Sequence, residues 1–156
     1  MFNTFSRFLH STETVTKPHE KREPPTPRRI LVVDDEEPIR KLVDRVLSGV
    51  GYKTALAADG VEALQVATEL GAFDLLVTDL MMPQMSGDDL ARRLLSAQPQ
   101  LKVLYLTGHS ERLFKNRVML GENEAFLDKP FSVDGLRGAL ALIAPVRPET
   151  GERFLV

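Results

Sequence analysis

The feature that most constrains the fold is a regular alternation along residues 30 to 144. Short apolar runs rich in β-branched residues alternate with longer segments in which apolar residues recur at helical spacing. The runs predict strands at Ile30 to Val33, Lys53 to Ala57, Leu75 to Thr78, Val103 to Thr107 and Ala125 to Leu127. Consecutive βαβ units need right-handed crossovers and helices on both faces of the sheet. The pattern therefore predicts an α/β fold, a doubly wound five-stranded parallel sheet.

Five helices are expected between and after these strands. In the first, Pro38 suits the first turn and Gly49 or Gly51 suits the end. Its buried face is predicted to carry Ile39, Leu42, Val43, Val46, Leu47 and Val50. Other helices are marked by Val61, Leu64, Ala67 and Leu70, by Leu90, Leu94 and Leu95, and by Val133, Leu136, Leu140 and Ile143. A helix after Ser110 has the weakest pattern.

The length of 156 residues suits one domain with short ends. Residues 1–29 collect prolines among charged and hydroxyl residues, and a segment of this composition does not bury enough surface to order itself. We expect a flexible N-terminal extension over 1–29, a folded domain over 30–144 and a short C-terminal tail over 145–156. The Met1 start favours a whole gene product.

The composition narrows the classes of function. A net charge of −2 gives no bulk attraction to nucleic acid or to an anionic membrane. Without cysteine there is neither a disulfide framework nor thiolate chemistry, which fits a cytoplasmic location. No stretch approaches the roughly 20 apolar residues of a membrane span. We therefore expect a cytoplasmic protein that acts through a local site, with no direct contact to nucleic acid or membrane.

Acidic residues close two of the predicted strands. Asp34 and Asp35 follow the first strand, and Asp79 follows the third. In a doubly wound sheet these ends meet at one edge, where ligands bind. Clustered carboxylates repel one another unless a cation lies among them, so the pattern predicts a magnesium site with one carboxylate available as a nucleophile.

Four blocks resemble the signature of response-regulator receiver domains, and they occur in the family's order over about residues 29 to 144. They are Val33-Asp34-Asp35, Thr78-Asp79-Leu80-Met81-Met82-Pro83 with Gly87, Leu106-Thr107-Gly108, and Asp128-Lys129-Pro130-Phe131. The resemblance implies a flavodoxin-like (βα)5 receiver fold. It also implies that Asp79 is the phosphoacceptor and that Mg²⁺ (or Mn²⁺) is held by Asp34, Asp35, Asp79 and the backbone carbonyl of Met81.

The same resemblance assigns roles to the later blocks. Lys129 and Thr107 would contact the phosphoryl group, and the bond between Lys129 and Pro130 is a candidate cis peptide. Thr107 and Phe126 would form the switch, with Phe126 turning inward as the threonine moves. Two positions depart from common patterns and are predicted to tune dephosphorylation: Met81, which cannot orient a water and should slow hydrolysis, and His109, which could hydrogen bond to one.

These expectations describe a single-domain response regulator that accepts its phosphoryl group from a histidine kinase or histidine phosphotransfer protein. The output would be a downstream protein bound at the fourth helix, fifth strand and fifth helix, with Arg112, Lys115 and Arg117 on that surface. Beyond catalysing its own phosphorylation and slow dephosphorylation it would not be an enzyme. Alternatives are a phosphorelay intermediate or phosphate sink, and the receiver portion of a hybrid histidine kinase. An aspartate-nucleophile phosphatase fits less well, because the first strand ends in Asp34-Asp35-Glu36 rather than Asp-x-Asp. No phosphate loop follows that strand to support flavin binding.

Overall fold

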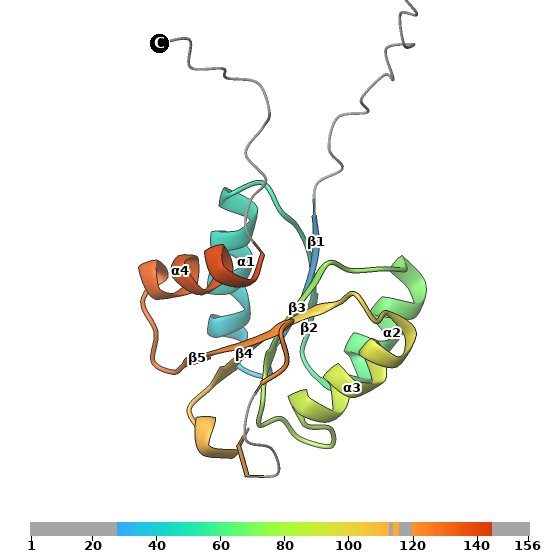
Figure 1. The fold of residues 1–156 in the computed structure, drawn as a ribbon. Helices are drawn as coiled ribbons and strands as arrows, with labels where there is room; N and C mark the ends of the chain where they lie inside the picture. The colour runs from blue at the N-terminus through green and yellow to red at the C-terminus, as the bar shows by residue number, and fades with distance from the viewer. Residues whose placement is uncertain (1–27, 113, 116–119, 145–156) are drawn as a thin grey trace, which may run out of the picture.

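A computed structural model describes residues 28–112, 114–115 and 120–144 of the chain. Its five strands form one parallel sheet in the order β2-β1-β3-β4-β5, which confirms the predicted doubly wound class (Figure 1). The strands are β1 (Arg29–Val33), β2 (Lys53–Ala57), β3 (Leu75–Asp79), β4 (Lys102–Thr107) and β5 (Glu124–Asp128). Each lies where the apolar runs predict one, with ends extended by at most one residue.

The α-helices of the described residues begin at residue types that are common at helix starts. They are α1 (Glu37–Gly49), α2 (Gly60–Leu70), α3 (Gly87–Ala97) and α4 (Val133–Ile143). α1 has Pro38 in its first turn. At the starts of the other three helices, the side chains of Asp59, Ser86 and Ser132 accept hydrogen bonds from backbone N–H groups that the helix leaves unpaired.

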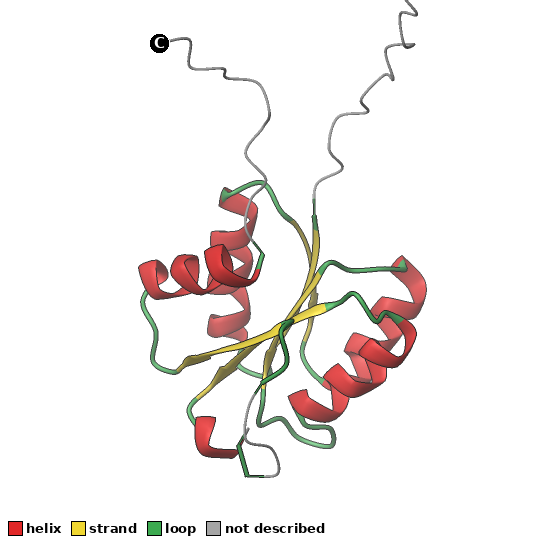
Figure 2. Ribbon diagram, in the orientation of Figure 1, coloured by secondary structure: helices red, strands yellow, loops and turns green. Residues whose placement is uncertain are grey.

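Helices cover both faces of the sheet and divide the core into two clusters (Figures 1 and 2). α1 and α4 pack on one face, and α2 and α3 pack on the other. Along β1, Ile30 and Val32 face the first pair of helices, while Leu31 and Val33 face the second. This alternation is why β1 is apolar at every position from Ile30 onward: side chains on both faces are buried.

The region after β4 differs from the expected fourth helix. Among the described residues it contains only a 3₁₀ turn, Ser110–Arg112, so the last helix is α4 rather than α5. Residues 113 and 116–119, and with them Arg117 of the expected output surface, lie outside the described residues. The predicted extension, apart from its last two residues, and the predicted tail also lie outside them.

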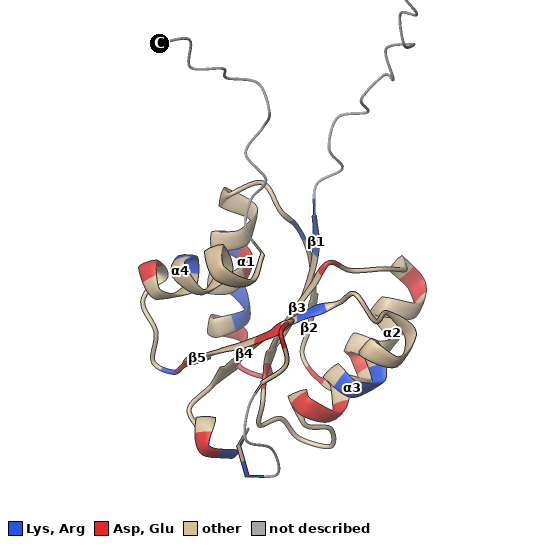
Figure 3. Ribbon diagram, in the orientation of Figure 1, with Lys and Arg blue, Asp and Glu red and all other residues tan. Residues whose placement is uncertain are grey.

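Charges of both signs occur on α1, α3 and α4 (Figure 3). No helix in the described part of the chain has the length and apolar character needed to cross a membrane. A cluster of acidic residues, Asp34, Asp35 and Asp79, lies at the carboxyl edge of the sheet. There Val33 is in register with Thr78, Asp79 with Leu106, and Thr107 with Asp128.

Candidate functional site

The carboxylates that were predicted to converge lie together in the fold. Asp34 and Asp35 follow β1 and Asp79 ends β3, and one carboxylate oxygen from each lies within 4.8 Å of the others. Asp34 and Asp79 are buried, whereas Asp35 is exposed. The convergence follows from the parallel pairing of β1 with β3, which ends both strands at the same edge.

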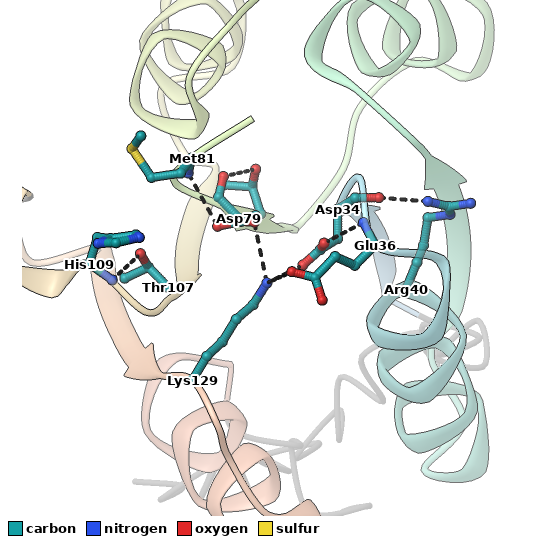
Figure 4. Close-up of polar contacts among 9 residues, drawn as sticks. Asp34, Glu36, Arg40, Asp79, Met81, Thr107, His109 and Lys129 are labelled. Atoms are coloured by element: carbon teal, nitrogen blue, oxygen red, sulfur yellow. Dashed lines mark hydrogen bonds and ion pairs between the residues drawn. The ribbon is translucent and has the colours of Figure 1, made fainter. Parts of the chain in front are cut away.

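Lys129 brings a positive charge into this cluster from the loop after β5 (Figure 4). Its Nζ donates to Asp34 Oδ2 at 2.9 Å and to Asp79 Oδ2 at 3.2 Å, and it lies 3.8 Å from Glu36 Oε1. Its backbone N–H donates to the carbonyl of Thr107 at 2.9 Å, and the Lys129–Pro130 peptide is cis. The ammonium therefore pairs with both buried carboxylates and balances one of their two negative charges.

The electrostatics of Asp79 and Lys129 are set by burial and by each other. Burial raises the pKa of Asp79, and the repulsion of Asp34 adds to this, while Lys129 and the Met81 N–H oppose it without cancelling it. For Lys129, burial alone would lower the pKa, but Asp34 and Asp79 outweigh burial and leave the pKa raised. The two carboxylates therefore favour the charged form of Lys129, whereas burial disfavours the charged form of Asp79.

The backbone around Asp79 is packed tightly. Its Oδ1 accepts a hydrogen bond from the Met81 N–H at 3.2 Å, and its backbone carbonyl accepts one from the Thr78 hydroxyl at 2.9 Å. At the start of α3, Gly87 approaches so closely that a Cβ on it would lie 2.0 Å from the Asp79 carbonyl oxygen. Only glycine fits at this position, which explains the presence of Gly87 in the motif.

The remaining predicted residues surround this centre. Thr107 is buried at the end of β4, one residue beyond the register partner of Asp79, and its Oγ1 accepts a hydrogen bond from the His109 N–H at 2.9 Å. The His109 side chain is exposed and lies 3.5 Å from Glu111. Met81 is 40% exposed at the rim of the site. No contact joins the side chain of His109 or Met81 to the carboxylates in the described residues, so their tuning roles stay predictions.

Phe126 points outward from β5. It is 37% exposed and packs edge-to-face against Phe114, with ring centroids 5.6 Å apart and an interplanar angle of 78°. It is therefore not an ordinary core phenylalanine. Phe114 was not singled out in the sequence, because it lies in the segment after Ser110 where no clear periodicity marks its neighbours.

The donor set fits a magnesium ion. Three carboxylates supply hard oxygen ligands at short mutual distances, and Mg²⁺ is bound in proteins through one or two carboxylates with water in the remaining positions. Asp34, Asp35 and Asp79 would hold the ion. The backbone carbonyl of Met81 as a further ligand stays a prediction.

Two further residues belong to the site and were missed in the sequence. Glu36 lies near Lys129, and the Arg40 guanidinium donates to the backbone carbonyl of Asp34 at 2.6 Å. One signal could have indicated Arg40: a positive side chain near the start of a helix runs against the helix dipole, so another interaction must favour it there.

The fold and the site together define a class of protein: flavodoxin-like α/β domains with an acidic centre at the carboxyl edge of the sheet. Comparisons with known proteins agree. The response regulator receiver domain family matches residues 30–141. The chain is 38% identical over 108 residues to the sensor kinase CckA of Brucella abortus (strain 2308), covering 69% of this chain and 11% of the kinase. It is 36% identical over 126 residues to the response regulator MprA of Mycobacterium sp. (strain KMS), covering 80% of this chain and 54% of that protein.

A solved structure gives the same result. The response regulator protein TrrA from Thermotoga maritima, in complex with Mg(2+)-BeF, superposes with a TM-score of 0.62 at 31% identity, covering 74% of this chain and 98% of that one. The chain belongs to the response regulator receiver domain family, whose members act in two-component signalling. It spans about half the length of MprA and about a tenth of CckA.

Proposed function

We propose that this chain is a response regulator that accepts a phosphoryl group on Asp79 from a histidine kinase or a histidine phosphotransfer protein. The observation that carries the proposal is the environment of Asp79, a nearly buried carboxylate with Lys129 on one oxygen and two further carboxylates beside it. Burying neighbouring carboxylates with only one lysine to pair with them costs free energy. A bound cation would lower this cost, and the site would then be ready to receive a phosphoryl group.

In the proposed reaction an Oδ atom of Asp79 attacks the phosphorus of a phosphohistidine. The P–O bond forms as the P–N bond breaks, and the imidazole leaves with the bonding electron pair and takes up a proton. Bound Mg²⁺ would neutralise charge on the carboxylates and the phosphoryl oxygens. Lys129 would move from Asp79 to a phosphoryl oxygen as a compact positive charge, since the carboxylate oxygen that it contacts becomes part of the acyl phosphate.

The proposed switch begins at Thr107. Phosphorylation adds about −1.5 to −2 charge and three acceptor oxygens, and the Thr107 hydroxyl can donate to one of them. Thr107 now accepts from the His109 N–H, so a shift of Thr107 would carry the following loop with it. Phe126 would then leave Phe114 and turn inward, changing the surface made by the segment after Ser110, β5 and α4. A downstream protein would bind one of these two populations more tightly.

A second assignment has specific support. The similarity to the sensor kinase CckA favours a receiver that works as part of a hybrid histidine kinase. A relay intermediate or a phosphate sink would use the same Asp79 chemistry in reverse. Transfer from phosphorylated Asp79 to a purified histidine phosphotransfer protein distinguishes these roles from a regulator that loses its phosphoryl group to water. The proposed localisation is cytoplasmic.

The test is the intact mass of the protein after incubation with acetyl phosphate, with and without Mg²⁺. We expect wild type to gain one phosphoryl group only with Mg²⁺ and Asp79→Asn to gain none. Asp134→Asn is the matched control, because Asp134 is an exposed acid on α4 far from the cluster in sequence, and it should behave as wild type. A phosphorylated Asp79→Asn protein would contradict the assignment of the phosphoacceptor. A wild type that gains nothing from acetyl phosphate or from a phosphorylated histidine kinase would contradict the proposed function.

A further inference from the structure

Arg40 makes an unusual contact with the loop that carries the acidic pair (Figure 4). Its Nη1 donates to the backbone carbonyl oxygen of Asp34 at 2.6 Å, which is short for an N–H···O bond and typical of a charge-assisted one. The residue is half-buried in the first turns of α1. Among the described residues it is the only side chain from outside the loop that hydrogen-bonds to the loop backbone, because the other such bond is made by Asp34 itself, whose Oδ1 accepts from the Glu36 N–H.

The two acids differ in how they are oriented. The Asp34 carboxylate is fixed at both oxygens, since Oδ1 accepts the Glu36 N–H at 2.9 Å and Oδ2 accepts Lys129. Asp35 is exposed, and no described residue makes a hydrogen bond or an ion pair with its carboxylate. The direction of Asp35 therefore depends on its backbone.

The carbonyl that Arg40 binds belongs to the peptide bond between Asp34 and Asp35. Because a peptide unit is planar, a hydrogen bond to its oxygen sets the orientation of the plane from which Asp35 continues. The Asp35 carboxylate lies within 4.8 Å of the other two acids in this orientation. A rotation of the plane would move it away from Asp79.

We propose that Arg40 is a positioning residue for the cation site: by binding the Asp34 carbonyl, it directs the Asp35 carboxylate toward Asp79. The inference rests on the proposed function, since it concerns the ion that the proposed reaction uses. For the loss of Arg40, this inference predicts a change in cation affinity opposite to the change expected from its charge alone. Removing a nearby positive charge should strengthen cation binding, whereas losing the orientation of a ligand should weaken it.

The experiment measures Mn²⁺ binding to the unphosphorylated chain, residues 1–156, by electron paramagnetic resonance, in which free Mn²⁺ is observed directly. We expect Arg40→Met, which keeps the apolar stem but has no donor, to raise the Kd about tenfold, the lower end for residues that orient metal ligands. Arg45→Met removes the same charge from an exposed position five residues further along α1 and should bind as wild type does. Arg40→Lys, which keeps a donor, should recover part of the affinity.

A double variant tests whether Arg40 acts on the cation site through Asp35. In an Asp35→Asn background, adding Arg40→Met should cause no further loss, because the ligand on which Arg40 acts has been changed. Urea unfolding of each variant without metal accompanies the binding data, so that only folded protein is compared. An Arg40→Met Kd equal to or below that of wild type overturns the inference, and so does an undiminished loss in the Asp35→Asn background. A wild type that binds no Mn²⁺ instead overturns the cation site of the proposed function.

Discussion

Replacing Gly87 by alanine tests how rigidly the end of β3, which carries Asp79, is held. An ideal Cβ at Gly87 would lie 2.0 Å from the Asp79 carbonyl oxygen and 3.1 Å from the Leu80 Cα, whereas ordinary contacts begin at 3.4 Å. Backbone atoms cannot rotate away as a side chain can, so either the start of α3 or the end of β3 must shift. Adding a methyl group to such a packed position costs about 1–3 kcal/mol of unfolding free energy.

The matched control is the same substitution on α4. Gly138 lies in the middle of that helix, and its Cβ would have no atom within 4 Å. Alanine there should increase the unfolding free energy by about 0.5–1 kcal/mol, because glycine loses more backbone freedom on folding. The two alanines are therefore predicted to change stability in opposite directions.

The assay combines urea unfolding, followed by circular dichroism without metal, with the initial rate of phosphorylation by acetyl phosphate. Gly87→Ala should lower both quantities, since displacement of a reacting group by about 1 Å can cost roughly a hundredfold in rate. Gly138→Ala should raise stability and leave the rate unchanged. A Gly87→Ala protein with wild-type stability and a wild-type rate would refute the reasoning. Lower stability with an unchanged rate would show that α3, and not Asp79, moves.

Three other predictions concern the site itself. Met81→Asn should speed the loss of the phosphoryl group, followed as the decay of the phosphorylated mass, because asparagine can orient a water and methionine is predicted to shield the phosphoryl group; an unchanged decay would contradict this role. Lys129→Met should lower the unfolding free energy by about 1–3 kcal/mol without metal, since two buried carboxylates lose their donor. Mg²⁺ should restore part of this loss in urea unfolding, and equal losses with and without Mg²⁺ would count against a shared site. In metal-free protein, Asp79 should titrate above the ordinary aspartic acid pKa of about 3.9 in ¹³C NMR spectra, because burial disfavours its charge. When the pKa of an acid is raised in the folded state, its ionisation lowers the free energy of unfolding as the pH rises through that pKa. Asp79→Asn should therefore be more stable than wild type at neutral pH and lose this advantage on acidification. A variant that is less stable than wild type at neutral pH would contradict the raised pKa.

The fold was largely predictable because its three central strands, β1, β3 and β4, are buried on both faces. Strands such as β3, where every residue is buried, leave continuous apolar runs that have few other interpretations. The convergence of Asp34 with Asp79 then follows from parallel pairing alone. The family blocks indicated Lys129, whose position after the edge strand has no periodic signal of its own.

The remaining parts depend on contacts that leave little trace in a sequence. Arg40 binds a backbone carbonyl, and every residue offers one, so no partner residue type marks the interaction. The contacts of the buried Tyr105 also leave no sequence pattern, because its hydroxyl lies near two acids from other elements, Asp88 of α3 and Glu124 of β5. The expected helix after Ser110 was the least supported element, and the described residues there form a 3₁₀ turn.

The order of the strands implies that different parts of the site differ in the free energy needed to open them locally. β1, which Asp34 and Asp35 follow, and β3, which ends at Asp79, lie inside the sheet and are each paired with two strands, whereas β5 is an edge strand that is only partly buried. Amide hydrogens of β5 should therefore exchange with solvent at a lower opening free energy than those of β3. Phe126 lies in β5, and Lys129 directly follows this strand. Local opening of β5 is therefore expected to displace Phe126 and Lys129 at a lower free energy than opening of β1 or β3 displaces the three acids.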